Sequence, residues 1–305
     1  QYEKWLASHK PFHWFIEFYG IMKVGGFDVI IGNPPYVEWS KIKDYKLQAE
    51  QYSTFDCGNI YTTVCERSYG LLARSGRFGM IVPLSCVSTE RMAPFRHAWT
   101  RFGLSTHVSH YSGDAHPSVL FQGVKFRLSI LIQYKGPNHT RLFSTHFLKW
   151  LPEGRDALFS LLRYTEVTPA LNRLGLVPKV ASEEHRAILQ KTSRQNTSIQ
   201  SCILDNSNHT VLSHRIVAHF VKAVDFVPFF RNERDGIKKS EDYKVFPVVD
   251  TGTQRTLTAL LNSSLFYSWF VTYSDVYHCG RELILDFPCD IPILSKHQGK
   301  EMLSI

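Results

Sequence analysis

The chain has 305 residues, of which 44% are hydrophobic and 20% are charged, and these values exclude a disordered or collagen-like protein. It has no run of about 18 apolar residues, which excludes a transmembrane helix. The first residues, QYEKWLASHK, lack the apolar core of a signal peptide, and the six cysteines form no CxxC pair. The sequence therefore predicts a cytoplasmic protein with reduced thiols. Because it begins with Gln1 rather than Met, we also expect an N-terminal part before it.

The net charge is +8 at pH 7. Residues 1–136 carry 15 basic and 10 acidic side chains, and the remainder carries 20 and 17. The excess is therefore spread over both halves of the chain. Such a balance fits a polyanionic partner, whose phosphates would be neutralised by the basic side chains. It fits ordinary surface charge equally well, and charge alone does not separate the two interpretations.

The first half alternates patterns typical of strands and helices. Residues 27–31, FDVII, form a short apolar run that predicts a buried strand. Apolar residues recur at helical spacing over 60–72, and Ser75-Gly76 is expected to end that helix before a second buried strand at 78–82. Two further strands are predicted at 106–111 and 126–134. This alternation predicts an α/β fold with a largely parallel sheet.

The second half has a different pattern. Gly136-Pro137-Asn138 ends the last predicted strand, and residues 214–230, HRIVAHFVKAVDFVPFF, suggest irregular β structure. An amphipathic helix is expected over 257–270. We therefore predict two domains, residues 1–137 and residues 138–305.

The strongest motif follows the first predicted strand directly: Gly32-Asn33-Pro34-Pro35-Tyr36. In open α/β sheets, ligands bind just beyond the carboxyl ends of the strands, where this segment lies. Two prolines remove backbone donors and leave carbonyl oxygens available, while Asn33 adds a side-chain acceptor and Tyr36 a flat ring. The set suits a planar group with an exocyclic amine. The alternative is a rigid strand-to-loop turn, for which Asn-Pro and Pro-Pro are common dipeptides.

This motif resembles the signature of the S-adenosylmethionine-dependent amino-methyltransferases. Within that family, the chain is similar to adenine-N6 DNA methyltransferases of restriction–modification systems, in particular the type IIG-like group. The similar segments are PFHWFIEFYGIMKVGGFDVIIGNPPYV (11–37), GNIYTTVCERSYGLLARSGRFGMIVPLS (58–85), GDAHPSVLFQGVKFRLSILI (113–132) and LTALLNSSLFYSWF (257–270). The resemblance implies the C-terminal half of a Rossmann-like methyltransferase sheet, followed by a mixed α+β target-recognition domain.

The resemblance also implies roles for individual residues. The catalytic loop would be Asn33, Pro34, Pro35 and Tyr36, in which the Asn33 side-chain oxygen and the Pro34 carbonyl accept the two N6 hydrogens of adenine. These contacts would stabilise the positive charge that develops on the nitrogen. Duplex DNA hides this amine, so the base would be flipped out and stacked between Tyr36 and Phe121. For Phe121, packing in the core is the alternative role.

The chain departs from the family at the methyl donor. Members of the family bind S-adenosylmethionine through a glycine-rich turn upstream of the catalytic loop, whereas this sequence contains no GxG. We therefore expect most of the donor site to lie outside this chain, and we assign no cofactor-binding residues. The chain alone is not expected to methylate a substrate.

The second half offers one candidate DNA contact, the mixed-charge stretch 231–244. Lys238 and Lys239 would meet phosphates, and Arg231 or Arg234 would read a guanine. A surface loop without a DNA contact explains the same composition equally well. The 14 histidines show no metal-ligand spacing, so no metal site is predicted.

The sequence thus predicts a site-specific DNA adenine-N6 methyltransferase that acts on double-stranded DNA, with an attached or separate restriction endonuclease as a possible partner and no membrane partner. A protein-glutamine methyltransferase is an alternative, because glutamine also presents a planar amide nitrogen. The long second half argues against it. A DNA-binding remnant without catalytic activity is the other alternative.

Overall fold

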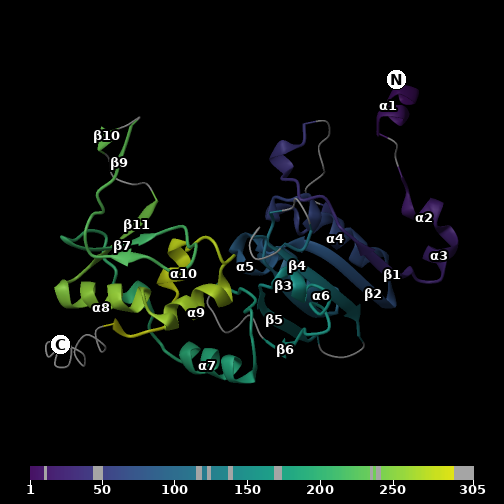
Figure 1. The fold of residues 1–305 in the computed structure, drawn as a ribbon. Coiled ribbons are helices and arrows are strands. Elements are labelled where there is room, and N and C mark those ends of the chain that lie inside the picture. Colours follow the sequence, from purple (N-terminus) through teal and green to yellow (C-terminus); the bar gives the residue numbers. More distant parts are fainter. Residues whose placement is uncertain are drawn as a thin grey trace. The chain divides into compact units, whose positions relative to one another are not determined.

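Figure 1 shows the fold as a ribbon, taken from a computed structural model of the chain. The structure describes residues 1–9, 12–43, 51–114, 119–121, 125–136, 140–167, 174–233, 236–237 and 242–291. The chain forms two compact units. The first comprises residues 1–83, 94–108 and 129–142, and the second comprises residues 84–93, 109–128 and 143–305.

Helices and strands alternate in the first half, as the sequence predicted. The helices are α1 (Tyr2–His9), α2 (Trp14–Glu17), α3 (Tyr19–Lys23), α4 (Ile60–Leu71), α5 (Ser85–Ser88), α6 (Ala93–Arg101), α7 (Glu183–Ser193), α8 (Thr251–Leu261), α9 (Ser264–Tyr273) and α10 (Arg281–Leu285). The strands are β1 (Phe27–Gly32), β2 (Leu72–Pro83), β3 (Leu104–Tyr111), β4 (Leu128–Lys135), β5 (Leu142–Leu148), β6 (Thr165–Glu166), β7 (His209–His214), β8 (Ala223–Val224), β9 (Arg231–Asn232), β10 (Gly236–Ile237) and β11 (Tyr243–Val248).

Six strands form one mixed sheet in the order β1-β2-β4-β3-β5-β6. β1 and β2 are parallel, with Phe27 opposite Leu72 and Gly32 opposite Met80, whereas β5 and β6 are antiparallel. Helix α4 connects β1 to β2 and packs against β2. Its N-terminus is capped by Asn59, whose side chain accepts a hydrogen bond from the Tyr61 N–H. The predicted α/β class is confirmed.

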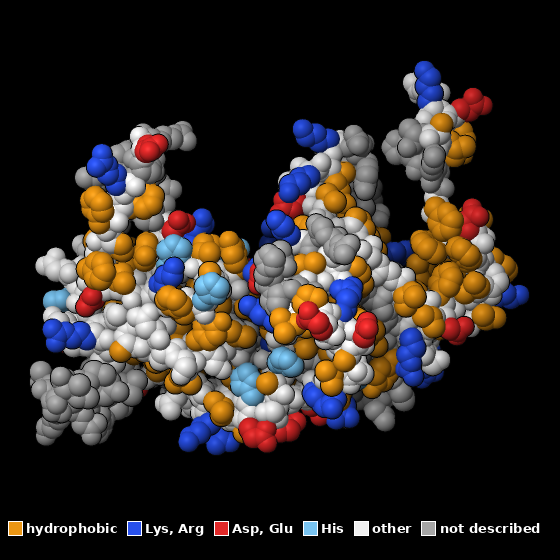
Figure 2. Space-filling view, in the orientation of Figure 1, with side chains coloured by type: hydrophobic (Ala, Val, Ile, Leu, Met, Phe, Trp, Pro, Cys, Tyr) orange, Lys and Arg blue, Asp and Glu red, His pale blue; other side chains and the backbone are white. Residues whose placement is uncertain are grey.

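Strand β1 is more exposed than predicted. Val29 is 58% exposed and Ile31 76%. β1 is also the terminal strand of the sheet and pairs only with β2 among the described strands. Apolar side chains also gather at the surface over α2 and α3, including Phe15, Ile16 and Tyr19 (Figure 2). The prediction of a buried strand assumed that both faces of an apolar run are covered, and here they are not.

The helix stop predicted at Ser75-Gly76 is also wrong. Helix α4 ends at Leu71, and Gly76 lies inside β2. The register between β1 and β2 shifts there, because Phe27 faces Leu72 but Val29 already faces Arg77. A Cβ on Gly76 would lie 2.6 Å from Leu72 Cγ and 2.9 Å from the Phe27 carbonyl oxygen. Gly76 therefore permits the close approach of a bulge rather than ending a helix.

A buried carboxylate organises the first unit. Glu66, on α4, is 7% exposed, and its oxygens accept hydrogen bonds from the Thr54 N–H at 2.9 Å and the Ser53 N–H at 3.2 Å. The Arg101 guanidinium forms an ion pair with it at 2.6 Å. Burial by itself would raise the pKa of Glu66, but the hydrogen bonds from Thr54, Arg101 and Ser53 outweigh it, and the pKa lies below 4.5.

Replacing this carboxylate should destabilise the protein. We expect Glu66→Ala to lower the free energy of unfolding by about 2–3 kcal/mol at pH 7, because the Thr54 N–H loses its charged acceptor. The folded-state pKa is depressed, so this stabilisation is complete above the unfolded pKa. The difference between variant and wild type should therefore shrink as the pH falls below 4.5. Urea denaturation measures both quantities.

Glu38→Ala is the matched control for this prediction. The Glu38 carboxylate is 53% exposed and pairs with Lys41 at 3.4 Å on the surface, so its loss should cost less than about 1 kcal/mol. Equal losses for Glu38→Ala and Glu66→Ala would contradict the structural role of Glu66.

The second unit contains a separate antiparallel sheet of three strands in the order β11-β7-β8. Within the stretch 214–230, for which irregular β structure was predicted, His214 is the last residue of β7, and β8 (Ala223–Val224) is the one strand that lies wholly inside. The remaining residues are irregular, as predicted. The helix predicted over 257–270 is divided into α8 and α9. Ser263 caps α9 by accepting from the Phe266 N–H, and the Asn262 side-chain nitrogen donates to the Ala223 carbonyl at 2.8 Å. These polar contacts end α8 where the apolar pattern alone predicted continuity.

A buried lysine lies in the second unit. Lys179 is 1% exposed, and its Nζ donates to the Ser274 carbonyl at 2.8 Å. Burial lowers the pKa of Lys179 to about 7, although Asp275 and Cys86 act in the opposite direction. The Lys179 ammonium group therefore loses its proton near neutral pH, whereas an exposed lysine stays charged there.

The six cysteines lie in the interior of the structure. All six cysteines are buried and free of disulfide bonds. In the described part of the chain, no helix combines the length and apolar character needed to cross a membrane.

Candidate active site

The segment Asn33-Pro34-Pro35-Tyr36 leaves the carboxyl end of β1 as a loop without regular secondary structure. Pro34 is buried, Asn33 and Pro35 are exposed, and Tyr36 is half-buried. Pro34 therefore joins the loop to the protein interior, while the Asn33 side chain is exposed. An exposed amide at this edge of the sheet is accessible to a ligand.

Tyr36 positions the side chain of Asn33. The Tyr36 hydroxyl lies 2.5 Å from Asn33 Oδ1 and 2.8 Å from the carbonyl oxygen of Ile81, on β2. Both oxygens are acceptors, so the single hydroxyl proton is directed between them. The contact with Ile81 fixes the phenol ring, and the contact with Asn33 orients the amide. Because an amide oxygen has two lone pairs, Asn33 Oδ1 retains capacity for a ligand N–H.

A row of aromatic rings supports Tyr36 from inside the first unit. The Tyr36 ring meets Tyr61 edge to face with centroids 6.3 Å apart, Tyr61 meets Phe95 at 5.8 Å, and Phe95 meets Trp99 at 5.6 Å. Tyr61 and Phe95 are fully buried. This support for Tyr36 was not predicted. In the sequence, Tyr61 belongs to the apolar pattern that predicts a helix over 60–72. That pattern gives no information about a contact with Tyr36.

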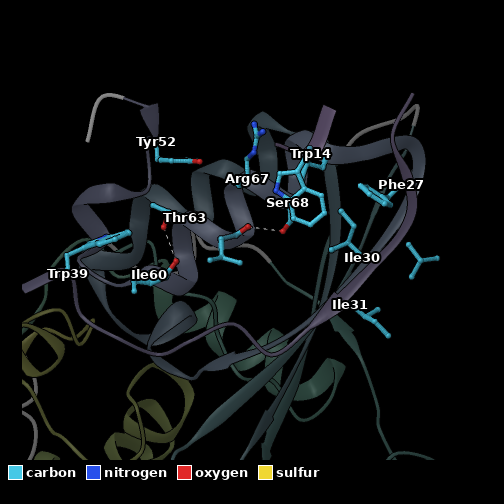
Figure 3. A pocket seen from close by; sticks show the side chains of 13 residues that line it. Trp14, Phe27, Ile30, Ile31, Trp39, Tyr52, Ile60, Thr63, Arg67 and Ser68 are labelled. Carbon is cyan, nitrogen blue, oxygen red and sulfur yellow. Dashed lines mark hydrogen bonds between the residues drawn. The ribbon is translucent and has the colours of Figure 1, made fainter. Parts of the chain in front are cut away.

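An apolar cavity lies beside this loop, between β1 and α4 (Figure 3). It has a volume of about 560 Å³. One of its lining residues is Ile31, which precedes Asn33 by two positions in the sequence. Aromatic and aliphatic side chains dominate its wall, and Arg67 is the one charged residue among those that line it in the described structure. The lining residues are Trp14, Phe27, Val29, Ile30, Ile31, Trp39, Tyr52, Ile60, Thr63, Val64, Arg67, Ser68 and Leu71.

The cavity does not fit a whole S-adenosylmethionine molecule. Its aromatic walls offer surfaces for a flat ring. However, the described lining residues include no carboxylate for ribose hydroxyls and no glycine-rich turn for the charged amino-acid portion. The location of the donor site stays a prediction.

Phe121 belongs to the second unit. Its side chain is 39% exposed, whereas the preceding Leu120 is buried. Phe121 is therefore not a core residue, which removes the alternative role considered for it. Stacking on a base stays a prediction.

The predicted DNA contacts are only partly described. Arg231 is exposed on β9, which pairs with β10 so that Arg231 lies opposite Ile237. Arg234, Lys238 and Lys239 lie outside the described residues. Two short strands thus present Arg231 at the surface, and its contact with DNA stays a prediction.

Among the residues that the structure describes, potential metal ligands do not cluster. Among the described residues, no group of three His, Cys, Asp or Glu side chains is arranged to hold a metal ion. His110 is completely buried, and burial lowers its pKa well below 6.5. One of its ring nitrogens lies 2.9 Å from the Ser144 hydroxyl, which satisfies it within the fold.

The N-terminal third of the chain is similar to known proteins. Residues 1–112 match the family described as Eco57I restriction-modification methylase. A type II restriction enzyme and methyltransferase of Methanocaldococcus jannaschii is 43% identical over 88 residues, which is 28% of this chain and 7% of that protein. The resemblance to restriction–modification methyltransferases is thereby confirmed.

Two solved structures of restriction-modification enzymes are similar to parts of this chain. The type ISP restriction-modification enzyme LlaGI, solved as a nuclease-deletion mutant with a DNA substrate mimic, matches with a TM-score of 0.45 and 12% identity over 67% of this chain and 22% of that one. The type IIL enzyme MmeI, solved with DNA, matches with a TM-score of 0.41 and 8% identity over 90% and 47%. The chain thus spans less than half the length of either structure.

Proposed function

Residues 1–112 form part of a restriction-modification methylase domain of the Eco57I family, and from this we propose that the chain takes part in site-specific methylation of adenine N6 in DNA. S-adenosylmethionine would supply the methyl group, and the substrate would be double-stranded DNA in the cytoplasm. A restriction endonuclease, attached or separate, would be its functional partner. The family match favours DNA over a protein glutamine as the methyl acceptor.

One observation carries the proposal: the Tyr36 hydroxyl fixes an exposed Asn33 amide at the carboxyl end of β1. The lone pair of an adenine N6 amine is delocalised into the ring, which makes the amine a poor nucleophile. Asn33 Oδ1 and the Pro34 carbonyl would each accept one N6–H, which draws the nitrogen toward tetrahedral geometry. The same two oxygens stabilise positive charge on the nitrogen as it gains the methyl group, so they act more strongly in the transition state than in the ground state.

The second half would supply target recognition. We keep the division into residues 1–137 and 138–305 as part of the proposal, with catalysis in the first part and DNA specificity in the second. Exposed Arg231 is the described candidate for a base or phosphate contact. Lys238, Lys239 and Arg234 complete the proposed contact set.

The proposal is tested by identifying the product of the reaction. The natural gene product that contains this chain should transfer a labelled methyl group from S-adenosylmethionine to duplex DNA, and hydrolysis followed by mass spectrometry should identify N6-methyladenine. Labelled cytosine would contradict the adenine assignment, and label in protein would support the glutamine alternative. DNA binding without transfer of label would support a non-catalytic remnant.

A further inference from the structure

The backbone next to Phe121 is held by a side chain from a later segment. Arg155 follows the short helix Pro152–Gly154, and its guanidinium donates from Nη1 to the Val119 carbonyl at 3.0 Å and from Nη2 to the Leu120 carbonyl at 2.7 Å. These are the two carbonyls that directly precede Phe121. Fixing two successive peptide planes sets the direction in which the Phe121 side chain leaves the backbone.

Other contacts hold the two ends of the segment that contains Phe121, near Gly113 and near Arg127. Gly113 approaches the backbone of Arg127 so closely that a Cβ would lie 2.6 Å from the Arg127 nitrogen. Asp114 forms an ion pair with Arg127 at 2.6 Å, and Lys149 lies 3.7 Å from the same carboxylate. The Arg127 guanidinium in turn lies 4.9 Å from the centre of the Tyr277 ring. These contacts bring the ends of the segment together, and Arg155 is what fixes the residues beside Phe121.

We propose that Arg155 is a positioning residue that fixes the direction of the Phe121 side chain before this ring stacks on the flipped adenine. The inference rests on the proposed function, because it assigns a purpose to a ring that would stack on the target base. An exposed loop ring is costly to order at the moment of binding. Hydrogen bonds that order the backbone beforehand reduce this cost, so Arg155 acts without touching the substrate.

The geometry separates this role from a simple attraction to DNA phosphate. A guanidinium has a planar fork of donors and bridges two carbonyls, whereas a lysine ammonium carries the same charge without that fork. Arg155→Lys should therefore behave like Arg155→Ala if the fork matters. If Arg155 attracts only phosphate, Arg155→Lys should behave like wild type.

The first measurement is hydrogen exchange of the backbone amide of Leu120 in the natural gene product. Leu120 is 5% exposed, so its amide is shielded from solvent while Arg155 holds this backbone, and Arg155→Ala and Arg155→Lys should both speed its exchange at least about tenfold. Because Arg155 is exposed, neither variant should impair folding. Arg163→Ala is the matched control, since Arg163 is also exposed and its Nη1 donates only to the adjacent Leu162 carbonyl among the described contacts. Unchanged exchange in both Arg155 variants would overturn the proposal.

The second measurement is a double-mutant cycle on base capture. The DNA is a duplex with 2-aminopurine at the methylated adenine, once that site has been located by sequencing DNA modified by the enzyme. Phe121→Ala should reduce the preference for this duplex over one without the site by about five- to 150-fold. Arg155→Ala should reduce it in the same direction and alter the probe fluorescence in the same way. The double variant should equal Phe121→Ala alone, because Arg155 acts through Phe121.

The outcomes distinguish the inference from the function on which it rests. Additive effects of the two substitutions, or full preference in Arg155→Lys, would overturn the positioning role while leaving the methyltransferase assignment intact. Absence of any methylated adenine with the wild-type protein would overturn the proposed function and, with it, the purpose assigned to Arg155. Faster exchange in that case would show that Arg155 orders the loop without serving base capture.

Discussion

Substituting Asn33 by alanine should lower methyl transfer by at least about 100-fold, the scale expected when one preorganised polar contact to the transition state is lost. Asn33 Oδ1 is held by the Tyr36 hydroxyl at 2.5 Å, so the acceptor is oriented before the base arrives. The affinity for DNA should change little, because the lost contact is strongest in the transition state. Single-turnover kinetics with labelled S-adenosylmethionine and a parallel DNA-binding titration, both on the natural gene product, measure the two quantities.

Three further variants sharpen this prediction. Asn33→Asp keeps acceptor oxygens and should retain more activity than Asn33→Ala. Tyr36→Phe keeps the ring but removes the hydroxyl, so it should lower the rate less than Asn33→Ala does. Asp28→Ala changes an exposed residue on β1 and should leave the rate near that of wild type. Near-normal turnover of Asn33→Ala would remove Asn33 from the catalytic role.

The free energy of unfolding should rise between pH 7 and pH 9 because of one buried side chain, Lys179. Its pKa is lowered by burial from 10.5 to about 7. Above the folded-state pKa, the unfolded chain binds more protons than the folded protein, so stability increases as the pH rises toward the unfolded value. The penalty at pH 7 is on the order of 4 kcal/mol, and about 2 kcal/mol of it should disappear by pH 9.

Lys179→Met should remove this contribution, since methionine has a similar volume and no charge. Urea denaturation at pH 7 and pH 9 should therefore give a rise about 2 kcal/mol larger for wild type than for Lys179→Met. The other titrating groups are common to both proteins, so the comparison isolates the lysine. Lys191→Met, at an exposed position of α7, should keep the wild-type rise. The prediction fails if Lys179→Met shows that rise too.

The pattern of residues along the chain determined the local elements and the place where the first strand ends. The run FDVII predicted β1, the helical spacing after Asn59 predicted α4, and the residues Asn33 to Tyr36 marked the end of the strand, beyond which the chain has no regular secondary structure. These inferences succeed because they depend on neighbours within one turn or one strand. The same motif pointed to the family that residues 1–112 match.

Tertiary structure decided everything that depends on partners distant in the sequence. The exposure of Val29 and Ile31 depends on which elements cover the face of β1, and the bulge at Gly76 arises from the register between β1 and β2. Periodicity carries neither kind of information, since an apolar run looks the same with or without a covering neighbour.

The same limit explains which side chains of the site were missed. Tyr36 orients Asn33 only because the carbonyl of Ile81, on the adjacent strand, holds its hydroxyl. Arg155 reaches the carbonyls before Phe121 from a segment after β5. Their roles arise from distances of 2.7–3.0 Å that only the folded chain creates, because a hydrogen bond depends on position in space and not on position in the sequence.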